Sequence, residues 1–256
     1  MKNYLRLRKK EMPELFVYDR REAQYYGKIS PFVKKFLKAL NKNNRGIRLI
    51  LEGVPGSGKT AIGRVISGMT GIGFQDMDDW VSYQTDKKVG EHIINMRTKK
   101  DYLDDKYLDF EEEVVKTLHL GDKAKYIIAT SGSNPLRIKS MDHLRGDNGI
   151  VVLLEADKNL LSKRMTDREE GLTQVTGSHS MSVADLIEYR KTFYEKNHNL
   201  RIDFGKETNV YRKAEEVLSR VTKVLERDNK FSVRVQKHLK KFIKKIHRAV
   251  SKIISP

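Results

Sequence analysis

Residues 53–60 read Gly-Val-Pro-Gly-Ser-Gly-Lys-Thr, and this short run constrains the chain more than any other. An apolar stretch at 47–51 precedes it, and a helical pattern at 59–69 follows it. Glycines allow the backbone to curl so that successive N–H groups point inward, where the following helix begins with its positive dipole end. A strand, a glycine-rich turn and a helix in this order are typical of the phosphate-binding loop G-x-x-x-x-G-K-[ST].

This loop predicts nucleotide binding, with ATP and Mg²⁺ as cofactors. The candidate nucleotide-binding residues are Gly53, Gly56, Ser57, Gly58, Lys59 and Thr60. Lys59 would reach the β- and γ-phosphates as a catalytic residue, and the hydroxyl group of Thr60 would hold Mg²⁺. We also expect Lys59 to be an exposed loop charge, so that its replacement by alanine spares the fold. A phosphate loop alone does not say what is phosphorylated, so the rest of the site must decide.

The chain from Gly46 onward alternates short apolar runs with helical stretches, as a doubly wound parallel sheet requires. Strands are expected at 47–51, 73–76, 126–130, 150–154 and 200–204, and helices at 59–69, in segments from about 78 to 120, and at 160–165, 183–194 and 214–225. Residues 167–182 lack periodicity and form a candidate lid. The predicted fold is a three-layer α/β P-loop domain with a mostly parallel five-stranded sheet and basic helical extensions.

The net charge of +17 is concentrated at the two ends of the chain. Residues 1–45 hold thirteen Lys and Arg against four Asp and Glu, and residues 230–256 hold nine against none. Each end therefore carries +9, which leaves −1 for residues 46–229. A nearly neutral core argues against a nucleic-acid-binding surface there, and it assigns any attraction to polyanions to the extensions.

The N-terminal extension, residues 1–45, contains one clear helix signal, at about 31–42. Ser30-Pro31 is a cap followed by proline in the first turn, and an apolar face follows it: Phe32, Val33, Phe36, Leu37 and Leu40. We expect this face to pack on the core.

The whole chain lacks cysteine, which excludes disulfides, thiolate metal sites and a cysteine nucleophile, and fits a reducing compartment.

Several segments after the loop follow in an order that resembles the shikimate kinase family. Phe74-Gln-Asp-Met-Asp78 places two carboxylates at the end of the second strand. Residues 127–133 resemble the family's strand that ends in glycines, and residues 151–164 resemble its next strand with the nucleotide-contacting helix. Residues 186–203 resemble its closing helix and strand. The resemblance covers about Gly46 to Arg227, and it implies a shikimate-kinase-like P-loop kinase domain at 46–228.

The resemblance implies roles for individual residues. Asp76 would join Thr60 at the metal, and Asp78 would orient the acceptor hydroxyl and receive its proton as a catalytic base. Arg190 would grip a carboxylate group of the acceptor, Gly132 would lie against the acceptor, and Arg164 would lie against adenine. From the residues alone, the aspartates can also cap the next helix. Arg190 can instead form a surface salt bridge, and Arg164 can be a solvated helix charge.

Three positions depart from the family pattern. Leu108 stands where the family has an arginine, so a second acceptor-binding arginine is missing. Ser131 and Ser133 replace two glycines, which adds hydroxyl groups where the acceptor is expected to approach the backbone. In the lid, Glu170-Gly-Leu replaces Arg-Pro-Leu. These changes would weaken binding of a carboxylate by roughly several kcal/mol, so we expect a changed acceptor specificity with shikimate as a poor substrate.

Residues 229–256 carry apolar side chains at alternating spacings of three and four, with basic residues between them. The pattern predicts a basic amphipathic helix about 37 Å long. Such a helix can lie on an anionic membrane surface, pack on the enzyme or on a second copy, or bind a protein or nucleic-acid partner. We expect the membrane surface ahead of nucleic acid, and therefore a cytoplasmic protein that associates peripherally with a membrane.

The leading functional prediction is an ATP-dependent kinase that moves the γ-phosphoryl group to a hydroxyl group of a small acceptor. An alternative from another class is a degenerate nucleotide-binding kinase that acts as a membrane-associated regulatory or interaction protein. A third hypothesis is an enzyme whose phosphate acceptor is a protein or a nucleotide. The pair Asp78 and Arg190 favours catalysis, whereas Leu108 and the altered lid favour changed or lost activity.

Overall fold

The computed structural model describes residues 19–42, 46–85, 105–118, 120–121, 124–166 and 183–228. The predicted lid and the predicted C-terminal amphipathic helix lie outside these described residues. Within them, no helix is long and apolar enough to cross a membrane.

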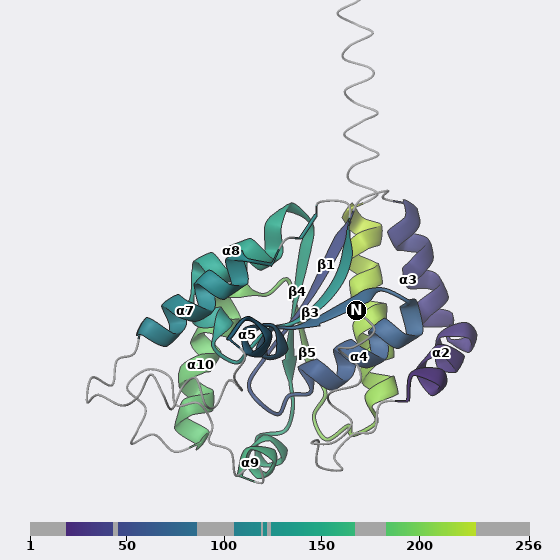
Figure 1. The fold of residues 1–256 in the computed structure, drawn as a ribbon. Coiled ribbons are helices and arrows are strands. Elements are labelled where there is room, and N and C mark those ends of the chain that lie inside the picture. The colour runs from purple at the N-terminus through teal and green to yellow at the C-terminus, as the bar shows by residue number, and fades with distance from the viewer. Residues whose placement is uncertain are drawn as a thin grey trace, which may run out of the picture.

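The described strands form one parallel sheet in the order β2-β3-β1-β4-β5 (Figure 1). The strands are β1 (Ile47–Glu52), β2 (Gly73–Asp76), β3 (Lys125–Ala129), β4 (Gly149–Glu155) and β5 (Leu200–Asp203). In the centre of the sheet, Leu49 of β1 pairs with Ile127 of β3 and with Ile150 of β4. The predicted α/β fold with a five-stranded sheet is confirmed, and all of the strand pairs are parallel.

Helices cover both faces of this sheet (Figure 1). On one side lie α2 (Arg20–Ile29), α3 (Pro31–Lys42), α4 (Lys59–Thr70) and a helix at 210–228. On the other side lie α5 (Met77–Thr85), α7 (Asp105–Lys116), α8 (Ile138–Arg145) and α10 (Val183–Asn197). The remaining elements are α9 (Lys158–Thr166) and the 3₁₀ turns η2 (Asn134–Leu136) and η3 (Gly146–Asn148). Three layers result, with the sheet in the middle.

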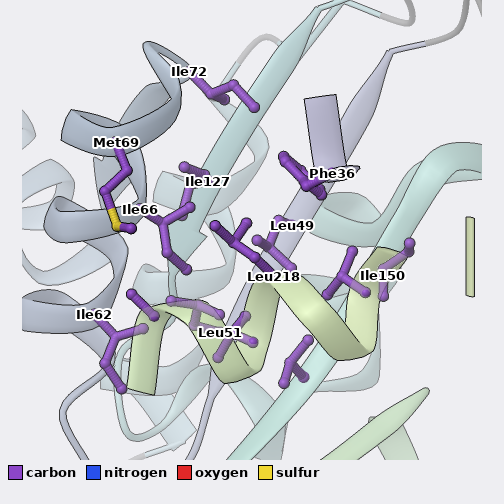
Figure 2. Packing of buried hydrophobic residues seen from close by; sticks show 14 of the residues in the cluster. Phe36, Leu49, Leu51, Ile62, Ile66, Met69, Ile72, Ile127, Ile150 and Leu218 are labelled. Carbon is purple, nitrogen blue, oxygen red and sulfur yellow. The ribbon is translucent and has the colours of Figure 1, made fainter. Parts of the chain in front are cut away.

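Alternate side chains of β1 enter different cores, because successive residues of a strand point to opposite faces. Leu49 and Leu51 belong to the larger cluster, which also contains side chains from α3, α4 and the helix at 210–228 (Figure 2). Ile50 belongs to a second cluster with residues of α5, α7 and α8. Glu52 follows Ile50 by two residues, so it faces the same side as α8.

The helix signal at about 31–42 corresponds to α3, which the structure places at Pro31–Lys42. Val33, Phe36 and Leu40 lie in the larger core cluster, as predicted. The prediction was wrong for Phe32, which is 41% exposed, because at 3.6 residues per turn it lies at the edge of the apolar stripe.

Helix α2 was not anticipated. Asp19 caps it, since its Oδ1 atom accepts a hydrogen bond from the N–H of Arg21 at 2.7 Å. The helix packs closely on α4 at Gly27, where no larger residue would fit. A Cβ atom at this position would lie 2.2 Å from the carbonyl oxygen of Met69. The N-terminal helices therefore share the core of the α/β unit.

Candidate active site

The phosphate-loop motif forms the turn between β1 and α4, at the carboxyl end of the central strand. Gly53, Gly56 and Gly58 have φ values of 145°, 85° and 100°. Residues with a Cβ atom rarely adopt such positive φ values, so the turn needs glycine at these positions. Ser57, which lies between two of them, is fully buried. The loop opens beside the N-terminus of α4, which favours an anion there.

Lys59 is the first residue of α4 and is only 8% exposed. Its Nζ atom donates hydrogen bonds to the carbonyl oxygens of Gly53 at 2.6 Å and Val54 at 3.2 Å. The expectation of an exposed loop charge was therefore wrong. A desolvated ammonium group needs acceptors, and the curled loop supplies them. The amine thus lies inside the loop, where a phosphate group would bind.

Thr60 and Asp76 meet beside this loop. The hydroxyl group of Thr60 donates to Oδ2 of Asp76 at 2.7 Å. The other carboxylate oxygen, Oδ1, accepts from the N–H groups of Asp78 at 3.0 Å and Asp79 at 3.4 Å. Asp76 therefore caps α5 with one oxygen and faces the phosphate loop with the other. Helix capping and a role at a metal had been alternatives in the sequence, and the two oxygens allow both.

This oxygen pair suits Mg²⁺. The ion prefers hard oxygen ligands and usually keeps several waters, together with one or two carboxylates and substrate phosphates. The described residues contain no group of three or more His, Cys, Asp or Glu that could hold a metal by themselves. Thr60 and Asp76 therefore fit a Mg²⁺ ion that is held jointly with the nucleotide.

Asp78 lies in the first turn of α5, and its carboxyl group has an environment unusual for an aspartate. Surrounding protein raises its pKa from 3.8 to about 8, with desolvation as the largest cause. Negative charges on Asp76, Glu111 and Asp79 add to the rise, and the ammonium group of Lys59 opposes it. Solvent still reaches the side chain, so water screens part of this repulsion. The carboxyl group can take up a proton at neutral pH.

The turn after β3 is tied to α7 by Glu111. The hydroxyl groups of Ser131 and Ser133 donate to its Oε1 atom at 2.5 Å and 2.9 Å, and Ser133 also lies 2.7 Å from Oε2. All three side chains are buried. The hydroxyl groups that replace two glycines therefore bind a carboxylate of the protein itself.

Arg190 and Tyr194 of α10 hold the same turn from the other side. The Tyr194 hydroxyl donates to the carbonyl oxygen of Gly132 at 2.9 Å. A Cβ atom at Gly132 would lie 2.9 Å from Nη1 of Arg190 and 3.1 Å from Cγ of Pro55. The structure thus brings Gly132, Arg190 and the phosphate loop together, and contact of Gly132 and Arg190 with an acceptor remains a prediction. Arg190 is only 2% exposed, so it does not form a surface salt bridge.

Arg164 of α9 contacts the phosphate loop. Its Nη1 atom donates to the carbonyl oxygen of Gly56 at 2.9 Å, and its Cβ atom is 3.4 Å from the position of a Cβ atom at Gly56. The side chain therefore stabilises the loop conformation. Contact with adenine remains a prediction.

Two buried acids, Glu111 and Glu52, lie at the site and were not expected from the sequence. Glu111 lies three residues after Leu108 and four before Val115, on the apolar stripe of α7. A carboxylate on such a stripe could have been noticed from helical spacing. Glu52 ends the apolar strand β1 and is 0% exposed. An acid at the end of a buried strand, directly before the phosphate loop, was the available signal.

The model of the shikimate kinase family matches residues 55–226. The shikimate kinase of Thermodesulfovibrio yellowstonii is 29% identical over 149 residues, which cover 58% of this chain and 80% of that protein. Threonine synthase-like 1 from Pongo abelii is 33% identical over 158 residues, which cover 60% of this chain. The matched region spans 19% of that protein, about a fifth of its length.

Solved structures give the same picture. Shikimate kinase from Acinetobacter baumannii, in complex with shikimate, has a TM-score of 0.55 at 21% identity and covers 68% of this chain and 93% of that chain. A likeness at this identity establishes the fold. The family model extends over more than half of the sequence. The chain therefore belongs to the shikimate kinase family, a family of ATP-dependent kinases that act on small molecules.

Proposed function

We propose that this protein transfers the γ-phosphoryl group of ATP to a hydroxyl group of a small acceptor. The observation that carries the proposal is the grouping of Lys59, the pair Thr60 and Asp76, and the proton-accepting Asp78 around one phosphate loop. Each element of phosphoryl transfer has a candidate side chain there: phosphate binding, metal binding and proton acceptance.

The proposed division of work follows from these positions. Backbone N–H groups of the loop and the amine of Lys59 bind the phosphates, and Thr60 and Asp76 hold Mg²⁺, which neutralises charge on the phosphates. Asp78 accepts the proton of the acceptor hydroxyl as its oxygen bonds to the γ-phosphorus and the bond to ADP breaks. A raised pKa suits this role, because the carboxylate then binds the proton firmly.

We further propose that the acceptor is not shikimate. Leu108, at the position of the missing arginine, is buried in the core. The positive charge of Arg190 is opposed by the buried Glu111, since both influence the pKa of Tyr194. The carboxylate group of Asp76 lies beside the phosphate loop. An anionic acceptor would meet repulsion here, so an uncharged polyol suits the described residues better.

The test is a screen for ADP release with pairs of acceptors that differ only in charge, such as shikimate and its methyl ester, together with neutral sugars and cyclitols. Neutral members should be preferred. Lys59→Ala and Asp78→Asn should abolish or strongly reduce turnover, while Asp79→Asn, in the same helical turn, is the matched control. Calorimetry that detects no MgATP binding would remove the proposal. A kcat/KM for shikimate that is typical of enzymes on their own substrates would refute only the changed specificity.

From the sequence alone we also propose that residues 229–256 attract the protein to anionic membrane surfaces. Their apolar seam and nine basic residues support this role.

A further inference from the structure

Glu52 has no partner for either of its carboxyl oxygens. The residue ends β1 and immediately precedes Gly53, the first residue of the phosphate loop. Its side chain is 0% exposed, and both Oε1 and Oε2 are buried without a hydrogen bond. A buried carboxylate without hydrogen bonds is strongly disfavoured, whereas the neutral acid costs much less. The burial therefore favours the protonated form.

Charged and titratable groups face Glu52 from three helices. Lys59 of α4 and Arg145 of α8 both act on it as positive charges. The charge of Glu52 raises the pKa of Tyr194 of α10, which the charges of Arg190 and Glu111 also influence. Desolvation outweighs the two cations and raises the pKa of Glu52 from 4.5 to about 8. The proton on Glu52 is therefore held, but it can be lost at mildly alkaline pH.

Lys59 links this buried acid to the nucleotide site. Its amine bonds the carbonyl oxygen of Gly53, the residue next to Glu52, at 2.6 Å. In the proposed function the same amine must turn to the phosphates of ATP. An ionised Glu52 would retain the amine by Coulomb attraction and would add a negative charge directly behind the phosphates.

We propose that Glu52 is a positioning residue of the nucleotide site, which acts through Lys59, and that ATP binds to the form of the protein in which Glu52 carries its proton. This inference rests on the ATP-binding role proposed above. The direction of the linkage follows from charge. Phosphates bound beside the loop disfavour ionisation of Glu52 further, so ATP binding takes up a proton wherever Glu52 is ionised in the free protein.

The experiment is titration calorimetry of the full chain with MgATP, from about one pH unit below to one above the Glu52 pKa of about 8. Phosphate groups lose their last proton with a pKa of about 6, so ATP itself contributes little in this range. The dissociation constant of the unaltered protein should rise above pH 8, with a limiting slope of about tenfold per pH unit for one linked proton.

Glu52→Gln keeps the shape of the side chain and mimics the uncharged, protonated form of Glu52. It should match the unaltered protein at neutral pH and should lose most of the rise in the dissociation constant at alkaline pH. Glu155→Gln is the matched control, because Glu155 ends the neighbouring strand β4 but is paired with Arg201 at the surface. This control should keep the full pH dependence.

A second measurement separates Glu52 from Asp78, whose pKa is also about 8. Binding heats near pH 8, compared in two buffers of different ionisation enthalpy, should reveal net proton uptake that persists in Asp78→Asn and falls in Glu52→Gln. A pH-independent affinity without proton uptake, or a Glu52→Gln protein that keeps the original slope, would overturn the inference while leaving ATP binding intact. Weak ATP binding by folded Glu52→Gln at every pH would also overturn the inference, since ATP binding would then require the ionised form of Glu52. If the unaltered protein does not bind MgATP, the proposed function fails first, and this inference fails with it.

Discussion

The hydroxyl group of Thr60 lies 2.7 Å from Oδ2 of Asp76, which joins the first turn of α4 to the end of β2 beside the phosphate loop. The two side chains are sixteen residues apart in the chain. Because β2 and β1 run parallel within one sheet, their carboxyl ends lie at the same edge and bring the two oxygens together.

Removal of either oxygen should weaken metal use. Thr60→Ala and Asp76→Asn should each raise the Mg²⁺ concentration for half-maximal turnover, by about 10- to 100-fold on the scale seen when residues that support a metal are altered. Asparagine keeps an oxygen that can cap α5, so the fold should persist. Thr60→Ser retains the hydroxyl group and is the control. An unchanged Mg²⁺ requirement in both variants would contradict the assignment.

Asp78 should give the reaction an alkaline-rising pH profile. A general base works in its ionised form, so turnover should increase as pH rises through the Asp78 pKa, which desolvation and neighbouring acids raise above its usual value. The profile should be measured at saturating MgATP, where the pH dependence of ATP binding does not enter. Asp78→Asn should lower kcat by about 10²- to 10⁴-fold and remove this rise. A variant that keeps both rate and profile would show that another group accepts the proton.

The cluster of Ser131, Ser133 and Glu111 should affect the acceptor rather than the nucleotide. Ser133→Ala removes two close contacts to the buried Glu111 carboxylate and should cost about 1–3 kcal/mol of unfolding free energy. The turn that carries Gly132 would loosen, so KM for the acceptor should rise while the MgATP dissociation constant stays constant.

Ser140→Ala is a control for this prediction, since Ser140 is also buried but lies on α8. Its acceptor KM should remain near the original value. A larger change in ATP affinity than in acceptor KM for Ser133→Ala would assign the turn to the nucleotide half of the site.

Deletion of residues 230–256 should abolish sedimentation with anionic liposomes and leave ATP binding intact. Each basic residue near an anionic surface contributes up to about 1 kcal/mol, and residues 46–229 carry only −1. Higher salt should weaken the binding of the full chain, because exposed charges are screened over about 10 Å at 0.1 M. If the truncated protein melts several degrees lower and the full chain ignores anionic liposomes, the segment is structural.

Local patterns in the sequence were sufficient for most elements near the site. The phosphate loop, β2 at Gly73–Asp76 and the two aspartates around its end follow from glycine spacing and short apolar runs. Such patterns work because backbone conformation and the exposure of one face depend on residues within a few positions. Helix α8 was missed, since Ile138–Arg145 is short and largely polar and so lacks a clear apolar period.

The contacts that define the site's chemistry depend on tertiary structure. The bonds from Ser133 to Glu111 join positions 22 residues apart, and Tyr194 reaches Gly132 across 62 residues. The sequence by itself determined that a phosphate loop is followed by two carboxylates, and it predicted a diverged acceptor half. Only the folded chain decided that Lys59 is buried inside the loop and that Glu52 stands behind it without a hydrogen bond. The physical reason is that desolvation and charge proximity arise when distant segments pack together, and periodicity within one segment carries no information about them.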